Sequence, residues 1–443
     1  MDFDDAQAYL HSHIDLEKTT GISAGHVAGL SLDRMRQVVD VLGHPQRDYP
    51  VIHVTGTNGK GSTARMITAL LAAHQLSIGT YASPHLEHVT ERITRNAEPI
   101  DPEAFAAVVG EIAALEDQHF FTDRPSYFEL LTAAAFAWFS QEAVDAAVVE
   151  VGLLGRYDAT NVANGQVAVV TNVGKDHTDG TGDWRRRVAG EKAGIVKPGS
   201  LLVLGEPDPE LRDLFTGEGA DAVWVRDEDF GVMTDRVALG GHVVDMRTPF
   251  AEHDEVFLPV HGAHQADNAA LAVTAVEAFF GRALDADVVT EALGGLRLPG
   301  RFEVLHRAPL FVLDGAHNAD GAAAAAATLA DEFAIAGTRR WVLGVLDGRD
   351  LDELLDAFDL RPGDQVIATT APSPRGVPAS ELASAVASRE VDVLVVPQVD
   401  RAVERAWAAA QEAGEGDLVI VTGSLYTVGA ARTASRRLGI LTT

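Results

Sequence analysis

Short runs of β-branched and apolar residues alternate along the chain with longer segments in which apolar residues recur at helical spacing. The short runs predict buried strands, and the longer segments predict helices. This alternation is typical of a parallel sheet that is covered by helices on both faces, so we expect an α/β fold. The first predicted strands cover residues 51–55, 78–82, 146–151, 167–173 and 201–204, and the first predicted helices cover residues 102–115, 127–139 and 184–196.

The pattern changes between residues 220 and 259, where short β-branched stretches around Gly240 and Gly241 indicate antiparallel strands before a helix at 265–280. A second alternation begins near Phe302, with alanine-rich helices between the strands; the run 322–327 is interpreted as one tightly packed helix. Its predicted strands cover residues 310–314, 341–345, 366–369, 391–396 and 418–422. Because Leu298-Pro299-Gly300 breaks regular structure, we place a domain boundary there, between domains at 1–298 and 299–443.

Residues 51–63 combine a predicted strand, a glycine loop at 56–61 and an apolar-faced helix from Ser62 onward. Backbone N–H groups of such a loop at a helix N-terminus bind phosphate oxygens, Lys60 adds a positive charge, and the Ser62 hydroxyl is a ligand for a hard metal ion. The spacing differs from the usual G-x-x-x-x-G-K-[ST], since Gly61 intervenes between Lys60 and Ser62. We expect a nucleoside triphosphate here, bound by Thr57, Asn58, Gly59, Lys60, Gly61, Ser62 and Thr63. The fold prediction becomes a P-loop ATPase domain with a central, mostly parallel sheet, followed by a smaller Rossmann-like α/β domain.

Composition limits the partners of this 443-residue chain. The formal net charge is −30, from 65 acidic and 35 basic residues, which argues against binding to nucleic acid or an anionic membrane but leaves small anionic substrates open. Without cysteine there is no disulfide framework, thiolate metal site or thiol nucleophile. The start of the chain lacks a signal-peptide pattern, and no apolar run reaches the ~18 residues of a membrane span, so we expect a cytoplasmic protein.

Polar residues follow two of the predicted strands, at the edge where open parallel sheets place their ligands. Glu150 ends an apolar run and is interpreted as a magnesium ligand opposite Ser62, with a capped structural glutamate as the alternative. Asp176 and His177 follow the strand at 167–173, so imidazole at a second metal is a hypothesis beside a purely structural histidine.

Two further segments are ambiguous on their own. Residues 152–161 form a glycine-punctuated polar stretch that is placed to touch phosphate or substrate, or serves only as a strand-to-helix turn. Lys192 would by default be a solvated helix residue.

Together these motifs resemble the Mur ligase superfamily and, within it, the folylpolyglutamate synthase and dihydrofolate synthase family. Nine motifs occur in family order across nearly the whole chain. They are residues 55–62 (Thr-Gly-Thr-Asn-Gly-Lys-Gly-Ser), 83–86 with 91–93, 127–129, 150–152 with 158–161, 176–178, 191–195, 298–302, 314–318 and 423–426.

The resemblance implies an ATP-dependent ligase. ATP would phosphorylate a carboxylate of dihydropteroate or a reduced folate, and the amino group of L-glutamate would attack the acyl phosphate to form an amide. A loose phosphoryl-transfer transition state needs positioned charge, which Lys60 and two magnesium ions would supply. The resemblance also implies that Ser62 and Glu150 bind one magnesium ion, that His177 helps to hold the other, and that Lys192 is carbamylated and acts as a metal ligand.

The resemblance assigns further contacts to both predicted domains. The nucleotide would touch Asn268, Arg301 and Asp314, so catalysis implies domain closure that excludes water from the acyl phosphate. The expected pterin contacts are Ser83, Pro84, His85, Tyr127, Phe128, Glu129, Tyr157, Asp158 and Ala159. Expected contacts near the glutamate or the phosphates are His317, Ser424 and Tyr426. The family's usual state implies a monomer.

The chain departs from the family pattern at Leu154, where a glycine is usual, at Tyr157, where an aliphatic residue is usual, and in a longer segment at 15–28.

A cell-wall precursor ligase is a rival interpretation, but only 54 residues precede Thr55, too few for a typical UDP-sugar-binding domain with its linker. A second rival is an ATP-binding regulatory module without turnover, which the retention of the metal-ligand set argues against. The sequence leaves open whether the product is dihydrofolate, a polyglutamate or both.

Overall fold

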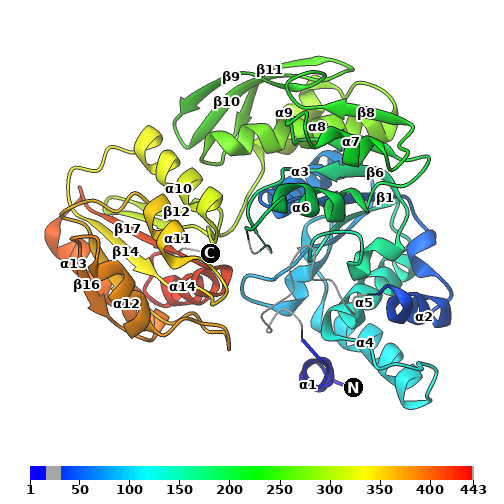
Figure 1. The fold of residues 1–443 in the computed structure, drawn as a ribbon, viewed down its shortest axis with the longest axis horizontal. Coiled ribbons are helices and arrows are strands. Elements are labelled where there is room, and N and C mark those ends of the chain that lie inside the picture. The colour runs from blue at the N-terminus through cyan, green and yellow to red at the C-terminus, as the bar shows by residue number, and fades with distance from the viewer. Residues whose placement is uncertain (16–30, 177, 179, 442–443) are drawn as a thin grey trace.

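The computed structural model describes residues 1–15, 31–176, 178 and 180–441. Two mostly parallel sheets dominate the molecule, one before residue 299 and one after it. We call residues 1–298 the N-terminal part and residues 299–443 the C-terminal part. Figure 1 shows the C-terminal part at the left, in yellow to red, and the N-terminal part at the right, in blue to green. The predicted α/β class with mostly parallel sheets is confirmed.

The main sheet of the N-terminal part has eight strands within the described ranges, and β1 lies between β5 and β6. β1 leads into the glycine loop at 56–61, which we call the phosphate loop after its predicted role. Six strands run parallel, while β3 and β4 add an antiparallel edge. In sheet order the strands are β4 (Glu98–Pro99), β3 (Ile93–Arg95), β2 (Ile78–Tyr81), β5 (Ala146–Glu150), β1 (Val51–Thr55), β6 (Gly165–Val170), β7 (Leu201–Leu204) and β8 (Ala222–Val225).

Helices cover both faces of this sheet, because successive residues of a strand point to opposite sides. Ile52 and Val54 of β1 pack in one hydrophobic cluster with α3 and α8, whereas Val51 packs in another with α4 and α5. The helices of the N-terminal part are α1 (Phe3–His11), α2 (Asp33–Val41), α3 (Lys60–Ala73), α4 (Pro102–Asp117), α5 (Tyr127–Gln141), α6 (Trp184–Ala193), α7 (Arg212–Thr216), α8 (Ala263–Phe280) and α9 (Ala286–Gly294). Short 3₁₀ helices are η2 (Pro45–Arg47), η3 (Val89–Arg92) and η4 (Ala159–Val162).

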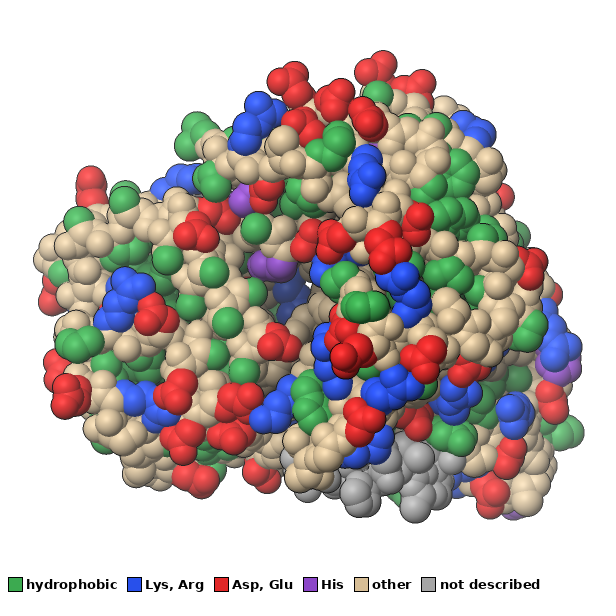
Figure 2. Space-filling model, turned by 45° about the horizontal axis from the view of Figure 1, so that its top comes forward, with side chains coloured by type: hydrophobic (Ala, Val, Ile, Leu, Met, Phe, Trp, Pro, Cys, Tyr) green, Lys and Arg blue, Asp and Glu red, His purple; other side chains and the backbone are tan. Residues whose placement is uncertain are grey.

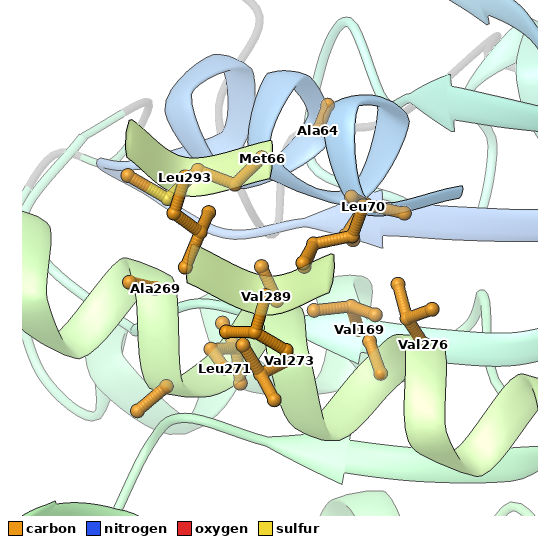
Figure 3. Close-up of a cluster of buried hydrophobic side chains, with 14 of the residues drawn as sticks. Ala64, Met66, Leu70, Val169, Ala269, Leu271, Val273, Val276, Val289 and Leu293 are labelled. Atoms are coloured by element: carbon orange, nitrogen blue, oxygen red, sulfur yellow. The ribbon is translucent and has the colours of Figure 1, made fainter. Parts of the chain in front are cut away.

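A three-stranded antiparallel sheet of β9 (Gly231–Ala238), β10 (Gly241–Arg247) and β11 (Glu252–Leu258) lies at the top of Figure 1. It confirms the antiparallel strands predicted between residues 220 and 259, although β8 in the same stretch joins the parallel sheet. Figure 3 shows the core below it, where Met66 of α3, Val273 of α8 and Leu293 of α9 belong to one buried cluster. Burial of one such side chain is worth roughly 1.5–3 kcal/mol, so this cluster firmly attaches α8 to the phosphate-loop helix α3.

The C-terminal part contains a second sheet, with β12 antiparallel and the other strands parallel. In sheet order its strands are β12 (Glu303–Arg307), β13 (Leu310–Leu313), β17 (Leu418–Thr422), β14 (Arg339–Leu343), β15 (Gln365–Ala368) and β16 (Asp392–Val395). Its helices are α10 (Ala319–Glu332), α11 (Leu351–Ala357), α12 (Ala379–Ala387), α13 (Val399–Ala413) and α14 (Leu425–Arg437). One cluster joins α10, α11 and α12 to one face, and another joins α13 and α14 to the other.

Two predicted boundaries beside the phosphate loop were wrong. Helix α3 begins at Lys60 rather than at Ser62, because Gly59 takes a left-handed conformation (φ 82°) and forms the N-cap. Strand β6 ends at Val170 rather than at residue 173, because the chain leaves the sheet there to bond the loop, with the N–H of Thr57 donating to the Asn172 carbonyl at 3.1 Å.

The two parts contact each other through Glu87, which lies in the loop after β2. Its carboxylate accepts hydrogen bonds from Arg432 at 2.6 Å, from Thr433 at 2.7 Å and from Arg436, all on α14. These groups hold the pKa of Glu87 at about 2, against the opposing effect of its burial. The loop that the resemblance assigns to the pterin is therefore attached to the C-terminal part.

The described helices include none that is long and apolar enough to cross a membrane.

Candidate functional site

The phosphate loop is held by glycines that have no room for a side chain. A Cβ on Gly56 (φ +153°) would lie 1.7 Å from Thr171 Oγ1, and one on Gly59 would lie 2.5 Å from Asn268 Oδ1. Both the N–H of Thr57 and that of Asn58 donate to Asn172 Oδ1, at 3.2 and 3.0 Å. The loop is therefore shaped by the chain after β6 and by α8 as well as by its own residues.

Lys60 stands at the first position of α3, and its Nζ donates to the carbonyls of Gly56 and Thr57 at 3.0 and 3.2 Å. Burial lowers the pKa of Lys60, although Glu150 acts in the opposite direction. An ammonium ion that is curled over its own loop and poorly solvated is suited to bind an incoming phosphate.

Two cavities meet at this loop. The larger cavity, of about 690 Å³, includes Thr57 and Lys60 in its lining, and the smaller, of about 210 Å³, includes Ser62. Both are lined by Asn58, Gly59, Gly61, Arg301 and His317. In Figure 2 a hollow opens between the two parts of the molecule, with basic side chains and a histidine at its rim, although acidic side chains are spread over much of this face.

Glu150 ends β5 within the larger cavity and is only 5% exposed. Its Oε2 accepts a hydrogen bond from the Ser83 N–H at 3.3 Å, and a Cβ built on Gly61 would lie 3.5 Å from the same oxygen. Burial raises the pKa of Glu150, while Lys60 and Arg301 oppose that shift. A buried carboxylate that faces a cavity beside a phosphate loop has the oxygen donors that Mg²⁺ prefers, so the site fits the ion. Within the described residues, no group of three or more acidic and histidine side chains is gathered tightly enough to hold a metal ion by itself.

Lys192 lies near the end of α6 and is 4% exposed, so it is not the solvated residue that its position in a helix suggests. Burial, and to a smaller extent Lys60, holds the pKa of Lys192 well below its ordinary value. The segment at 152–161 packs directly on this turn, since the Arg156 N–H donates to the Glu191 carbonyl at 2.8 Å and Asn161 Nδ2 donates to the Gly194 carbonyl at 3.0 Å.

Leu154 adopts φ 60° with its side chain buried, and its carbonyl accepts a hydrogen bond from Thr55 Oγ1 at 2.7 Å. The left-handed region favours glycine, which is the residue usual in the family at this position. Packing of Leu154 in the cluster with Val151 and Val188 opposes the strain that a side chain introduces in this conformation.

Asp158 lines the larger cavity and is fixed from behind. It accepts hydrogen bonds from the N–H groups of Leu153 at 2.8 Å and Thr160 at 3.0 Å, while the Thr160 hydroxyl bonds His53 Nε2 at 2.9 Å. Burial raises the pKa of Asp158 and lowers that of His53 to about 3, so His53 is neutral near pH 7.

The C-terminal part contributes residues to the lining of both cavities, opposite the phosphate loop. The carboxylate of Asp314 accepts hydrogen bonds from the N–H groups of Phe302 and Ala316, each at 2.9 Å, and this fixes the turn after β13. Asn318 exchanges hydrogen bonds with Asn58 of the phosphate loop, at 3.0 and 3.3 Å. The two parts thus meet directly at the loop.

His317 lies where the cavities join. Its Nδ1 is 2.9 Å from the Gly315 carbonyl, which only accepts, so Nδ1 carries the proton, and Nε2 lies 3.7 Å from Asp176 Oδ2. Burial lowers the pKa of His317 to about 4, which keeps the ring neutral near pH 7.

Asp176 and Lys175, which follow β6, contact the C-terminal part. Asp176 pairs with Arg349, and Lys175 pairs with Glu353. All four residues line the larger cavity. Burial, reinforced by Arg375, lowers the pKa of Arg349 to about 10, so its guanidinium stays charged at neutral pH.

Most of the residues that the sequence singled out come together at these cavities, and a few do not. Those in the lining are Thr57, Asn58, Gly59, Lys60, Gly61, Ser62, Ser83, Pro84, Phe128, Glu129, Glu150, Tyr157, Asp158, Ala159, Asn268, Arg301, Asp314, His317, Ser424 and Tyr426. Thr63, His85, Tyr127 and Lys192 are outside the lining. His177 and most of the segment 15–28 lie outside the described residues.

Three of the residues outside the lining, Thr63, Tyr127 and His85, have structural partners. Thr63 is buried and its hydroxyl reaches Asn268 Oδ1 at 3.4 Å, and Tyr127 is buried with its ring stacked on His11. His85 Nδ1 accepts a hydrogen bond from Arg92 Nε at 2.9 Å.

Sequence reasoning missed several lining residues, among them Arg34, Asn172, Arg349 and Arg375. The signal for Arg349 was present, because it comes shortly after the predicted strand at 341–345, whereas Asn172 was placed inside the predicted strand at 167–173. Arg34 carried no such signal; its Nε contacts the Glu129 carboxylate at 3.2 Å.

Known proteins with similar sequences and structures identify the family. The chain matches the Mur ligase middle domain over residues 54–276 and the Mur ligase glutamate ligase domain over residues 300–425. It is 40% identical over 440 residues to a dihydrofolate synthase/folylpolyglutamate synthase of Mycobacterium tuberculosis, covering 91% of this chain and 89% of that protein.

Solved structures agree along the whole chain. The folylpolyglutamate synthase of Mycobacterium tuberculosis complexed with ADP and AMPPCP matches with a TM-score of 0.88 at 37% identity, covering 98% of each chain. A bifunctional folylpolyglutamate synthase/dihydrofolate synthase with Mn, AMPPNP and L-glutamate bound matches with a TM-score of 0.83 at 30% identity, again covering 98% of each chain. The chain therefore belongs to the folylpolyglutamate synthase/dihydrofolate synthase family of Mur ligases.

Proposed function

We propose that this protein is an ATP-dependent ligase that joins the carboxylate of a pterin or folate to the amino group of L-glutamate through an acyl phosphate. The observation that carries this proposal is the meeting of two cavities at one phosphate loop: Asn58, Gly59, Gly61, Arg301 and His317 line both cavities, and Lys60 and Glu150 line the larger one. ATP in the smaller cavity would direct its terminal phosphate toward an acid held in the larger one. The relatives support both ligands, since one was solved with ADP and AMPPCP and another with L-glutamate.

The residues around the phosphate loop would catalyse two steps. In the first, a carboxylate oxygen attacks the terminal phosphorus and ADP leaves, while Lys60 and Arg301 neutralise charge on the phosphate oxygens. In the second, the glutamate amine attacks the acyl carbon and inorganic phosphate leaves. The amine loses a proton, which would pass to water. His317, with its pKa lowered to about 4, is a weak base and would instead donate a hydrogen bond from Nδ1 to the Gly315 carbonyl and keep a neutral ring beside the reacting groups.

Divalent metal belongs to this proposal as well. Ser62 and Glu150 would hold one Mg²⁺, and His177 with a modified Lys192 would hold a second; bound Mg²⁺ screens phosphate charge and favours ADP as the leaving group. A relative was solved with Mn bound.

The two parts are proposed to be domains, at 1–298 and 299–443, because no sheet among the described strands crosses that boundary. We also propose a monomer in the cytoplasm. Sedimentation of the purified chain tests the monomer.

The function is tested by phosphate release from ATP with Mg²⁺ and L-glutamate, comparing dihydropteroate, tetrahydrofolate and no acceptor. A product heavier by one glutamyl unit with dihydropteroate supports dihydrofolate synthesis, and serial additions to tetrahydrofolate support polyglutamate synthesis. ATP binding without turnover on either pterin would overturn the proposal in favour of another acid or of a regulatory module.

Carbamylation of Lys192 gives a separate prediction. Its low pKa makes the neutral amine available, and that amine attacks CO₂ to form the N–C bond with release of one proton. We expect ¹³C NMR with labelled bicarbonate to show one carbamate carbon in the wild type and none in Lys192→Met. Lys192→Glu, which retains a carboxylate, should keep more activity than Lys192→Met. An identical carbamate signal in Lys192→Met would contradict the assignment.

A further inference from the structure

Helix α10 belongs to the C-terminal part, but it borders the smaller cavity and is anchored at both ends to the N-terminal part. Asp320, Gly321, Ala324 and Ala325 contribute to the lining of that cavity. The helix begins after Asn318, which bonds Asn58 of the phosphate loop. It ends at Glu332, about 20 Å away for a helix of this length. In Figure 1, α10 lies beside the antiparallel sheet and α8.

The Glu332 side chain is 3% exposed and uses both oxygens across the boundary between the parts. Oε1 accepts from His242 Nε2 at 2.9 Å and from the Gly262 N–H at 2.7 Å. Oε2 is 2.6 Å from His261 Nδ1, which donates, since the carboxylate can only accept. Three donors from the N-terminal part thus meet one carboxylate of the C-terminal part.

Two of those donors lie at the start of α8. Gly262 is the N-cap of α8 and has φ 99°, and a Cβ there would lie 2.8 Å from Thr328 Oγ1 of α10. Three and six residues later, Gln265 and Asn268 line the smaller cavity and bond each other at 3.0 Å. Asn268 also contacts Thr63 and stands against Gly59 of the phosphate loop. The carboxylate of Glu332 therefore fixes the turn from which the cavity-lining side chains of α8 project.

The titratable groups around Glu332 stabilise its ionised carboxylate in the contact with His242, His261 and Gly262. His242 lies between Glu332 and Asp235, whose Oδ1 is 2.6 Å from His242 Nδ1. Hydrogen bonds to both carboxylates raise the pKa of His242 to about 9, and the histidines hold the pKa of Glu332 at about 2 despite its burial. His264, the remaining titratable neighbour, lines the smaller cavity and also feels Asp314 and Arg301. At neutral pH the His242 imidazolium therefore pairs with the ionised Glu332 carboxylate, and Asp235 lies on the other side of its ring.

We propose that Glu332 is a positioning residue for nucleotide binding, which holds the first turn of α8 in place so that Gln265 and Asn268 meet ATP in the smaller cavity. This inference rests on the proposed function only in taking that cavity as the nucleotide site. It gives α10 a mechanical role, because the helix ties the phosphate loop at Asn58 to the start of α8.

The test compares Glu332→Gln with Asp331→Asn, which makes the same charge change one residue earlier at an exposed position of the same helix. ADP binding is measured by calorimetry without folate, and KM for ATP, KM for dihydropteroate and kcat are measured in turnover. We expect Glu332→Gln to raise the Kd for ADP and the KM for ATP about tenfold, with KM for dihydropteroate and kcat within about twofold of the wild type. Asp331→Asn should match the wild type, and Glu332→Asp should recover part of the affinity.

A merely structural role predicts a different result, in which Glu332→Gln melts earlier but binds ADP as the wild type does at a temperature where both are folded. That result overturns the proposal. An equal rise of the Kd for ADP, the KM for ATP and the KM for dihydropteroate would overturn it as well. If Glu332→Gln does not fold, His261→Gln removes one of the three donors and must itself raise the Kd for ADP for the proposal to stand. The calorimetry does not depend on turnover, so the absence of ligase activity in the wild type would reject the proposed function and leave this comparison intact.

Discussion

Replacing Lys60 by alanine is expected to lower kcat at least about 100-fold, as loss of a group that stabilises transition-state charge does in other enzymes. Among the described residues, Lys60 Nζ bonds the loop carbonyls of Gly56 and Thr57, and burial lowers its pKa, so the charged form gains most when phosphate arrives. The loop itself is fixed by Asn172 and Thr171, so Lys60→Ala should fold with a Tm close to that of the wild type. Phosphate release under saturating substrates measures the effect.

The chain offers a matched control in Lys197. Its Nζ also donates to a backbone carbonyl, that of Gly194 at 2.9 Å, but the residue lines neither cavity. Lys197→Ala should keep kcat within a factor of about three. A Lys60→Ala enzyme that retains a tenth of the wild-type kcat would remove Lys60 from the proposed chemistry.

The buried parallel strands could be predicted closely from the sequence. β1, β7 and β17 have the predicted bounds, because each is an apolar run that ends where polar or glycine residues begin. Other elements were missed: β12 is only half-buried and its charged residues hide the pattern, and α1 and α2 were not predicted at all. The opposite edge strand β16 was predicted at 391–396 and lies at Asp392–Val395. β6 was extended too far because Thr171 to Val173 still resemble a strand locally. What ends β6 is a bond to the phosphate loop, which is more than a hundred residues away in the chain.

The candidate site divides in the same way. Residues at strand ends, such as Glu150, were found because a general property of parallel sheets places them there. Individual contacts across the two parts were missed, even where one partner such as Asn58 was itself a predicted site residue, because sequence does not say which side chains of the two parts meet. Glu332 and His242 are 90 positions apart, and Asn58 and Asn318 are 260 apart. Leu154 is an intermediate case: the departure from the family glycine was visible, but only the structure shows that Leu154 has a left-handed backbone conformation.

Glu150→Gln is expected to lose at least about 100-fold in kcat while gaining stability in the absence of metal. Burial raises the folded-state pKa of Glu150 above its unfolded value. Above the unfolded pKa the unfolded chain ionises more readily than the folded one, so the ionised carboxylate destabilises the fold throughout the neutral range. A neutral amide of the same shape removes that cost. Bound Mg²⁺ would offset it in the wild type, so Mg²⁺ with ADP should raise the Tm of the wild type more than ADP alone does, and Glu150→Gln should lack the difference.

Glu277→Gln provides the opposite control. Glu277 is also a fully buried carboxylate, but it lies outside both cavities and accepts hydrogen bonds from His253 at 3.0 Å and from the Leu284 N–H at 3.0 Å. Both bonds are accepted by Oε1, and Oε2 has no hydrogen-bond partner among the described residues. Its amide variant should leave the Mg²⁺ dependence of the Tm unchanged, because Glu277 lies outside both cavities. If Glu150→Gln instead melts earlier and keeps its Mg²⁺ response, Glu150 is the capped structural glutamate, and the proposed metal must be held by other residues.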